Sequence, residues 1–304
     1  MLELPSVTLA CVDCINPAAA LIALRRSSLQ CRFARAVLVT DEAPSEPHDG
    51  IEVKRIPRLA SREAYSRFML TRLGDCFSTG HVLVAQWDGY VVNAGGWRAE
   101  FLEYDYIGAK WWHKDGRNVG NGGFSLRSRK LVDAVQALGL AECDHNEDDV
   151  ICRAARPALE ARNGIRFADE AIADGFAFER GVVRGDGLPF GFHGFFNMWR
   201  FLSPEDLPRL LDRLHPRTIL YVETLELAQQ YLRLKRHEEA LAVTSRVLDH
   251  NPNSIPALKM FCFAAHHSGR RWLAAQALKE LRRLEPPAKS PVPAGTPEAR
   301  PAYA

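Results

Sequence analysis

Two short runs of residues could carry out chemistry together. The first, VGNGGFSLRS at residues 119–128, is rich in glycine, and the second, NEDDVICR at residues 146–153, holds Glu147, Asp148 and Asp149 in succession. Backbone without side chains can approach a ligand closely. Consecutive carboxylates carry charge that a folded protein must solvate, pair or use. We therefore expect the two runs to act on a polar substrate.

The acidic run offers a general base. Glycosyl transfer to an alcohol needs a carboxylate that accepts the proton of the attacking hydroxyl group. We predict that Asp148 has this role, with Glu147 beside it as a second catalytic residue. A structural alternative stays open, because Asn146 can cap a helix whose dipole stabilises acidic residues in its first turn.

A divalent metal ion could be held by two residues that lie far apart in the sequence. Asp88 follows apolar residues in VLVAQWDGYVVN at 82–93, where its carboxylate could hold Mn²⁺ or Mg²⁺ against a substrate diphosphate. His193, in FGFHGFFNMW at 190–199, could complete the site through its imidazole. The simpler alternatives are a turn residue for Asp88, because Gly89 follows it, and a buried core histidine for His193.

A sugar or acceptor could be bound by aromatic and backbone groups. Trp111 and Trp112 are adjacent in a polar segment and could stack against a sugar face, although packing of at least one Trp into the core is commoner. We predict that Asn121, Gly122 and Gly123 contact the same ligand. The glycines also suit a tight connection with positive φ. The spacing matches neither a dinucleotide-binding fingerprint nor a P-loop.

Short apolar runs alternate with helical patterns through residues 1–202, which predicts an α/β fold: a mixed, Rossmann-like sheet with helices on both faces. We expect strands at residues 7–12, 36–41, 51–56 and 81–88. We expect helices at residues 18–29, after the capping residue Ser61, and at 129–138, ending at Gly139. The glycine-rich run is then predicted to be the loop in front of that last helix.

Ligands of open α/β sheets bind beyond the carboxyl ends of the strands. Polar residues at those ends, and a tyrosine on the helix that follows Ser61, are therefore candidates for binding a nucleotide-sugar donor. They are Asp13, Thr40, Asp41, Tyr65, Gln86 and Asp88.

The C-terminal part of the chain is predicted to be helical. We expect a helical linker at residues 203–220 and two repeated units at 221–288, because six framework residues recur with an offset of 34. The first set is Leu227, Ala228, Tyr231, Ala240, Val247 and Pro252, and the second is Phe261, Cys262, Ala265, Ala274, Leu281 and Pro286. The period resembles the tetratricopeptide repeat, apart from Thr224, where the second unit has Leu258.

Two repeats are fewer than independent stability usually requires. We therefore expect the repeats to dock on the first domain or on another subunit, and to be able to bind a protein partner. The tail at 289–304 is rich in proline and alanine, and we expect it to be disordered.

Charge and cysteine content restrict the class of protein. The 304 residues include 39 Lys and Arg against 37 Asp and Glu, a net charge of +2, which argues against nucleic acid as a partner. No stretch is apolar enough for a transmembrane segment, and the N-terminus lacks a basic leader, so we expect a cytoplasmic protein. The seven cysteines are odd in number, and we interpret the C-x-x-C of Cys11 and Cys14 as structural.

Four motifs in order, QWDGY, GNGGFSLRS, EDDVIC and FGFHG, resemble those of bacterial glycosyltransferase-like proteins with the GT-A plan. The resemblance covers about residues 7–201. The second and third motifs are also similar to the glycine-rich and acidic segments of the β-1,4-galactosyltransferases, which implies that Asp148 is the base. The resemblance further implies that Asp88 stands in the place of the D-x-D motif and that His193 is a metal ligand. Gln86 replaces the first acid of that motif.

The resemblance implies an inverting glycosyltransferase. A nucleotide-sugar donor would give its sugar to a hydroxyl group of a glycan, lipid-linked or protein acceptor, in the biosynthesis of a surface polysaccharide or in protein glycosylation. An inactive scaffold that binds partners through the repeats is an alternative, favoured by Gln86. A glycoside hydrolase is another, and it would need two carboxylates about 5 to 10 Å apart around one sugar.

Overall fold

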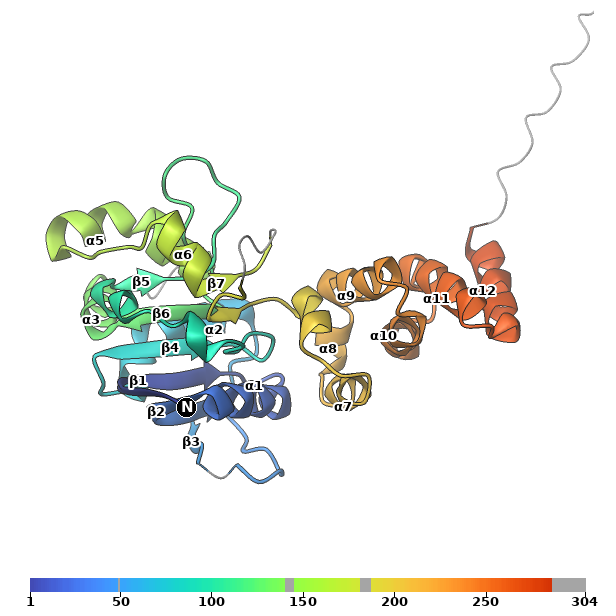
Figure 1. The fold of residues 1–304 in the computed structure, drawn as a ribbon, viewed down its shortest axis with the longest axis horizontal. Helices are drawn as coiled ribbons and strands as arrows, with labels where there is room; N and C mark the ends of the chain where they lie inside the picture. The colour runs from blue at the N-terminus through green and yellow to red at the C-terminus, as the bar shows by residue number, and fades with distance from the viewer. Residues whose placement is uncertain (49, 140–144, 181–186, 286–304) are drawn as a thin grey trace, which may run out of the picture.

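The computed structural model describes residues 1–48, 50–139, 145–180 and 187–285. An α/β part holds the N-terminal two thirds of the chain, and a row of helices extends from one side of it (Figure 1). The expected tail at 289–304 lies outside the described residues. Within those residues, no helix has both the length and the apolar character needed to cross a membrane.

The α/β part is built on a mixed sheet of six strands in the order β3-β2-β1-β4-β6-β5. The strands are β1 (Leu2–Val12), β2 (Cys31–Thr40), β3 (Glu52–Arg55), β4 (His81–Ala85), β5 (Tyr106–Ile107) and β6 (Phe124–Ser128). The pairs β1/β2, β1/β4 and β2/β3 are parallel, whereas β6 runs antiparallel to both β4 and β5. The predicted mixed sheet is confirmed.

Helices cover both faces of this sheet because the central strands are apolar on both sides. Leu9 of β1 packs with Leu21 of helix α1 (Pro17–Gln30), and α6 (Glu170–Phe176) lies on the same face. Val12 points to the other face, where Met69 of α2 (Arg62–Thr71) and Val132 of α3 (Arg129–Ala137) cover it. The predicted cap of α2 is confirmed, since the Ser61 hydroxyl accepts the Ala64 N–H.

The second half of the glycine-rich run is a strand, so the predicted loop at residues 119–128 is wrong in part. Phe124–Ser128 forms β6, pairs with β4 and is buried at every position. A strand buried on both faces loses the alternation that marks a half-buried one. Ser128 then caps α3 by accepting the Leu131 N–H, and Gly139, with φ of 64°, follows the end of that helix.

The acidic run begins a helix, as one of the two readings predicts. Glu147–Asp149 is a single α-helical turn, α4, which continues as a π-helix over Val150–Ala154 and then as α5 (Arg156–Asn163). Asn146 occupies the capping position, but its amide donates to the Asp149 carboxylate at 3.3 Å and makes no capping bond to the backbone. A small parallel pair, β7 (Ala177–Phe178) and β8 (Gly191–Phe192), and a 3₁₀ helix at Phe195–Arg200 complete this part.

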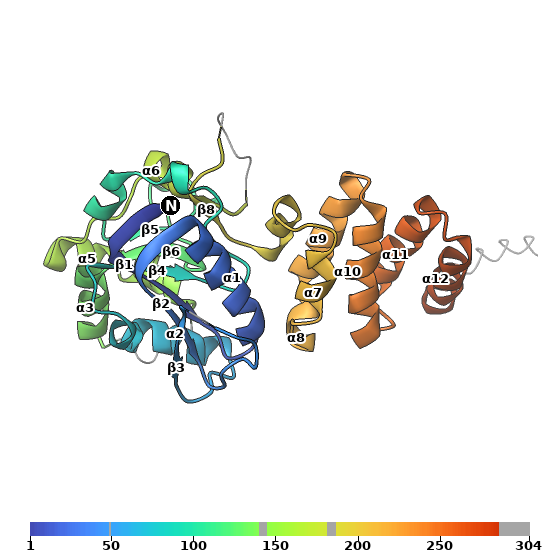
Figure 2. The same cartoon turned by 60° about the horizontal axis from the view of Figure 1, so that its bottom comes forward.

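The C-terminal part is helical, as predicted. Short helices α7 (Asp206–Leu211) and α8 (Pro216–Ile219) precede two helical hairpins. The first is α9 (Val222–Arg233) with α10 (His237–His250), and the second is α11 (Ile255–His267) with α12 (Arg271–Leu284). Figure 2 shows the four long helices side by side, reaching away from the sheet. Small buried residues such as Ala240 and Ala265 lie where the helices cross.

The helical part is attached to the α/β part by buried contacts. Ala19 and Ala23 of α1 belong to the same apolar cluster as Leu207 and Leu210 of α7. The side chain of Asn16 bonds Thr218 of α8 and accepts the His215 N–H at 2.9 Å. The start of the helical part is therefore fixed against the carboxyl edge of the sheet.

Candidate functional site

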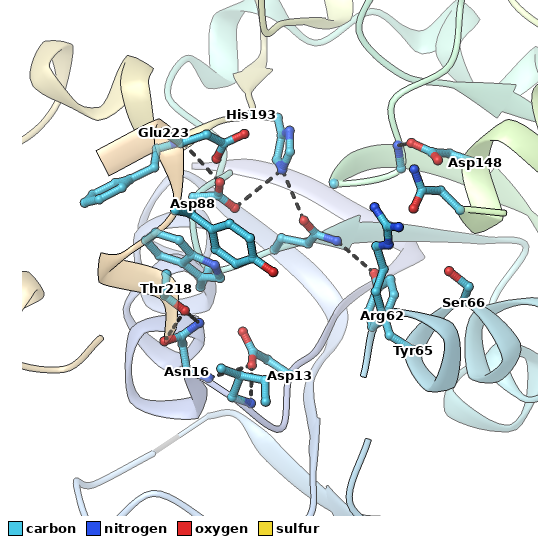
Figure 3. A pocket seen from close by; sticks show the side chains of 18 of the residues that line it. Asp13, Asn16, Arg62, Tyr65, Ser66, Asp88, Asp148, His193, Thr218 and Glu223 are labelled. Atoms are coloured by element: carbon cyan, nitrogen blue, oxygen red, sulfur yellow. Dashed lines mark hydrogen bonds and ion pairs between the residues drawn. The ribbon is translucent and has the colours of Figure 1, made fainter. Parts of the chain in front are cut away.

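A cavity of about 570 Å³ opens at the carboxyl edge of the central strands. Its walls come from the ends of β1 and β4, the start of α2, the loop before β6, helix α4, and helices α8 and α9 (Figure 3). The structure brings most of the predicted site residues into its lining. These are Asp13, Tyr65, Gln86, Asp88, Trp111, Trp112, Asn121, Gly122, Gly123, Glu147, Asp148 and His193.

Two predicted donor-binding residues do not line the cavity. Thr40 is fully buried at the end of β2, and its hydroxyl donates to the Glu42 carbonyl at 3.3 Å. The Asp41 carboxylate lies 3.8 Å from Nε of Arg58. Thr40 ends β2, the strand next to β1, and Asp41 follows it, so the polar end of this strand is held by contacts with the loop that comes after it.

Asp148 is held by two backbone N–H groups. Its Oδ2 accepts the Gly122 N–H at 2.8 Å, and its Oδ1 accepts the Asp149 N–H at 2.9 Å. Burial, and then the charge of Glu147, raise the pKa of Asp148 from its ordinary 3.8 to about 7, against the lowering effect of the Gly122 bond. A carboxylate with this pKa can take and release a proton near neutral pH, as a general base must.

Glu147 is engaged in a buried ion pair. Its Oε1 lies 2.8 Å from a terminal nitrogen of Arg127, and the side chains are 6% and 1% exposed. The same guanidinium donates to the Gly122 carbonyl at 3.3 Å and to the Ser125 hydroxyl at 2.9 Å. Glu147 therefore lines the cavity, but its carboxylate is paired with Arg127. The predicted catalytic role for Glu147 stays a prediction, and its contacts are those of a residue that positions the loop before β6.

Neighbouring side chains leave no room for a Cβ atom at the glycines of this loop. A Cβ at Gly122 would lie 2.3 Å from Oε1 of Glu147, and one at Gly123 would lie 2.1 Å from Nε2 of His193. Positive φ is not the reason, since the residue of the loop with positive φ is Asn121, at 53°. The loop thus brings its backbone against the acidic run on one side and against His193 on the other.

His193 is surrounded by polar side chains. Its Nε2 lies 3.1 Å from Oε1 of Gln86 and 3.4 Å from Oδ1 of Asp88, and its Nδ1 lies 3.1 Å from Oε1 of Glu179. Burial would lower the pKa of His193, but the carboxylates of Asp88 and Glu179 outweigh it and hold that pKa well above the ordinary value. The imidazole is therefore a cation between two carboxylates.

The surroundings of Asp88 offer some of the ligands that a divalent metal ion needs. Asp88 is 4% exposed and its Oδ2 accepts the Phe195 N–H, while its Oδ1 is buried with no hydrogen-bond partner among the described residues. Two ligands of one ion, each about 2.1 Å from it, can lie 3.4 Å apart, which is the distance from Oδ1 to Nε2 of His193. The amide oxygen of Gln86 is a further hard ligand of the kind that such ions accept. Within the described ranges, no group of three or more His, Cys, Asp or Glu side chains is arranged to hold a metal.

The two adjacent tryptophans have different environments. Trp111 is half-buried, and a Cβ at Gly120 would lie 2.2 Å from its ring, so this ring packs on the loop. Trp112 is 73% exposed. Trp111 packs against the edge of a core cluster, whereas Trp112 is exposed beside the ring of His113, so stacking of a sugar on Trp112 stays a prediction.

Asp13 and Tyr65 also line the cavity. Oδ1 of Asp13 accepts the N–H groups of Ile15 and Asn16, both at 2.7 Å, and burial raises the pKa of Asp13 to about 6 despite those bonds. The Tyr65 hydroxyl accepts a bond from the Gln86 amide at 3.0 Å. Gln86 therefore links Tyr65 to His193.

The sequence reasoning missed the charged residues that other elements bring to the cavity. They are Arg62, Glu179, Arg180, Arg217 and Glu223. Arg217 and Glu223 belong to the segment that was predicted to be a linker and a separate repeat domain. In Figure 3, Glu223 lies beside Asp88 and His193, and Asp148 lies on the other side of the cavity. No periodicity in the sequence indicates that α8 and α9 close a wall of the site.

Comparison with known proteins gives one family and several distant structures. Residues 50–193, which include the Asp88 segment, the glycine loop, Asp148 and His193, match the model of a family described as protein of unknown function, DUF5672. No curated protein matches the chain.

Among solved structures, residues 1–349 of S. aureus TarS are 11% identical, with a TM-score of 0.36, and the match covers 92% of this chain and 90% of that one. The same protein in complex with UDP-GlcNAc is 13% identical, with the same coverage and a TM-score of 0.36. The apo-form of the glycosyltransferase GlyE of Streptococcus pneumoniae TIGR4 is 12% identical, with a TM-score of 0.42, over 75% of this chain and 63% of that one.

Proposed function

We propose that the chain is a glycosyltransferase that moves a sugar from a nucleotide-sugar donor to a hydroxyl acceptor. The observation that carries this proposal is the arrangement of Asp148: a carboxylate in a cavity, fixed by two backbone N–H groups, with a pKa of about 7. A carboxylate of ordinary pKa is a weak base at neutral pH, whereas this one is matched to the proton of a reacting hydroxyl group.

The reaction is a single displacement. The hydroxyl oxygen of the acceptor forms a bond to the anomeric carbon of the donor, and Asp148 accepts the proton of that hydroxyl group. The bond from that carbon to the diphosphate oxygen breaks with its electron pair, so the nucleoside diphosphate leaves as an anion. Attack from the face opposite the leaving group inverts the configuration of the sugar. Trp112 offers a surface for the flat face of a sugar ring.

A divalent ion, if the protein uses one, would be held by Asp88 and His193 with the amide oxygen of Gln86. When bound there, Mn²⁺ or Mg²⁺ would neutralise charge on the departing diphosphate. Such binding requires His193 to lose its second proton, since only a neutral imidazole is a ligand. Asp88 would supply Oδ1, which makes no hydrogen bond among the described residues and lies 3.4 Å from Nε2 of His193.

Binding of donors comes first as a test. Nucleoside diphosphates and nucleotide sugars should raise the melting temperature in a thermal-shift assay, because a ligand that binds only the folded state stabilises that state. A chain that responds to none of them would lack the donor site, and the alternative of a scaffold acting through its helical hairpins would then be preferred.

Catalysis is tested with the donor and acceptor found in this way. Asp148→Asn should lower kcat by at least 100-fold, which is the usual contribution of a general base, and leave donor affinity within about threefold. Asp133→Asn is the matched control, because Asp133 is exposed on α3 in a surface pair with Arg129. Full transferase activity in Asp148→Asn would show that Asp148 is not the base.

A further inference from the structure

The charges of the cavity are unevenly placed. Six carboxylates line it, and they are Asp13, Asp88, Glu147, Asp148, Glu179 and Glu223. Three arginines line it, and they are Arg62, Arg180 and Arg217. A diphosphate binds where positive charge is not already neutralised by these carboxylates, so the position of any unpaired arginine decides where it can bind.

Arg180 is already neutralised. Its two terminal nitrogens lie 3.2 and 3.0 Å from the carboxylate oxygens of Glu226, and one of them lies 3.9 Å from Glu223. Arg62 and Arg217, by contrast, have no carboxylate within ion-pair distance among the residues that the structure describes. Both are exposed to the cavity solvent. Of the three arginines that line the cavity, Arg62 and Arg217 are therefore the two whose charge is available to a ligand.

The two arginines converge on one turn from different parts of the chain. Arg62 is the first residue of α2. Arg217, in α8, donates through a terminal nitrogen to the carbonyl of Ala60, two residues before Arg62, at 3.1 Å. The pKa of the exposed Glu63 is lowered mainly by the Ser61 hydroxyl and also by the charges of Arg62 and Arg217, as expected if both guanidinium groups lie near this turn.

The position of Arg217 is fixed by its neighbour. Thr218 is 7% exposed and bonds the buried Asn16 at 2.9 Å, and Asn16 also accepts the His215 N–H. Helix α8 therefore cannot move away from the carboxyl end of β1 without breaking buried hydrogen bonds. The backbone that carries Arg217 is therefore ordered before a ligand binds, which lowers the entropic cost of binding.

We infer that Arg62 and Arg217 together bind the diphosphate of the donor. This inference rests on the proposed function and deepens it, because it places the phosphates at the start of α2 and makes the helical part a component of the donor site. Guanidinium groups match the oxygens of phosphates through paired, charge-assisted bonds. Two arginines on a diphosphate also stabilise it as a leaving group, independently of any ion at Asp88.

Inorganic pyrophosphate is the first probe, because it carries the diphosphate without a base or sugar. Its binding is measured by calorimetry, with EDTA and again with Mn²⁺, for the wild type, Arg62→Met and Arg217→Met. UDP, GDP and ADP are measured in the same way. Arg282→Met is the matched control, because Arg282 is an exposed arginine of the helical part outside the cavity. Arg217→Lys keeps the positive charge, and melting temperatures check that each variant is folded.

We expect about a tenfold loss of pyrophosphate affinity in each methionine variant, since one charge-assisted bond is worth about 1.5 kcal/mol and 1.4 kcal/mol is tenfold. Arg217→Lys should recover part of that loss and Arg282→Met should show none. Equal affinity in the wild type and both methionine variants would overturn the inference and leave the proposed function standing. A wild type that binds neither pyrophosphate nor any nucleoside diphosphate, with or without Mn²⁺, would overturn both.

Discussion

The raised pKa of Asp148 has a cost in stability that can be measured without knowing the substrate. A carboxyl group that binds its proton more tightly in the folded state than in the unfolded state destabilises the fold as pH rises. Its pKa is 3.8 ordinarily and about 7 in the fold. The stabilising effect of the proton is complete below pH 3.8 and is lost as pH rises through about 7.

The shift sets the size of the effect. Each unit of pKa is worth about 1.36 kcal/mol, so the full loss across the range is about 4 kcal/mol. Between pH 5 and pH 8 the same relation gives about 2.6 kcal/mol. Asp148 is only partly buried, and solvent screening reduces the figure, so we expect about 2 kcal/mol.

The perturbation is Asp148→Asn, which keeps the shape of the side chain but cannot ionise. Urea unfolding of both proteins is measured between pH 5 and pH 8. The asparagine variant loses one of the two backbone bonds, worth about 1 kcal/mol at every pH, so it should be the less stable protein at pH 5 and the more stable one at pH 8. Asp133→Asn, on the surface, should show no such crossing. A stability difference between wild type and Asp148→Asn that is constant with pH would refute the assigned pKa.

Two further variants test the surroundings of Asp148 and of His193. Glu147→Gln removes the charge that, after burial, does most to raise the pKa of Asp148; we expect that pKa to fall below about 7, measured by carbon NMR titration of the carboxyl group, and an unchanged pKa would show that burial alone sets it. Gly123→Ala would place a Cβ 2.1 Å from the His193 ring and should lower the free energy of unfolding, measured in urea, by about 1 to 3 kcal/mol. Gly187→Ala, whose Cβ would have no atom of the described residues within 4 Å, should leave it unchanged. Equal stability in the two variants would mean that the His193 ring moves aside without cost.

The sequence was sufficient to predict the α/β class because its central strands are long and apolar and its helices carry clear start and stop residues. Ser61 and Gly139 mark helix ends where they were expected. The gathering of Asp13, Gln86 and Asp88 at one edge follows from the rule that parallel strands end together. Predictions of this kind depend on residues close in sequence, or on a rule that applies to the whole sheet.

The parts that could not be predicted depend on packing between distant segments. FSLRS is a strand because β4 pairs with it, and nothing in its own pattern distinguishes a fully buried strand from a loop beside glycines. Glu147 and Asp148 are neighbouring carboxylates, and only the folded structure shows that Arg127 forms its ion pair with Glu147 and not with Asp148. Arg217 reaches the cavity because Asn16, far away in sequence, holds α8 in place.

The buried bond between Asn16 and Thr218 limits how a chain of this design can be recombined. Expression of residues 1–202 alone would remove α8 and α9, and with them Arg217 and Glu223 from the cavity wall. Helical hairpins could instead be added after α12, the last described helix, without disturbing any residue of the cavity. Helices can therefore be added after α12, whereas α8 and α9 can be exchanged only together with the α/β part whose cavity wall they complete.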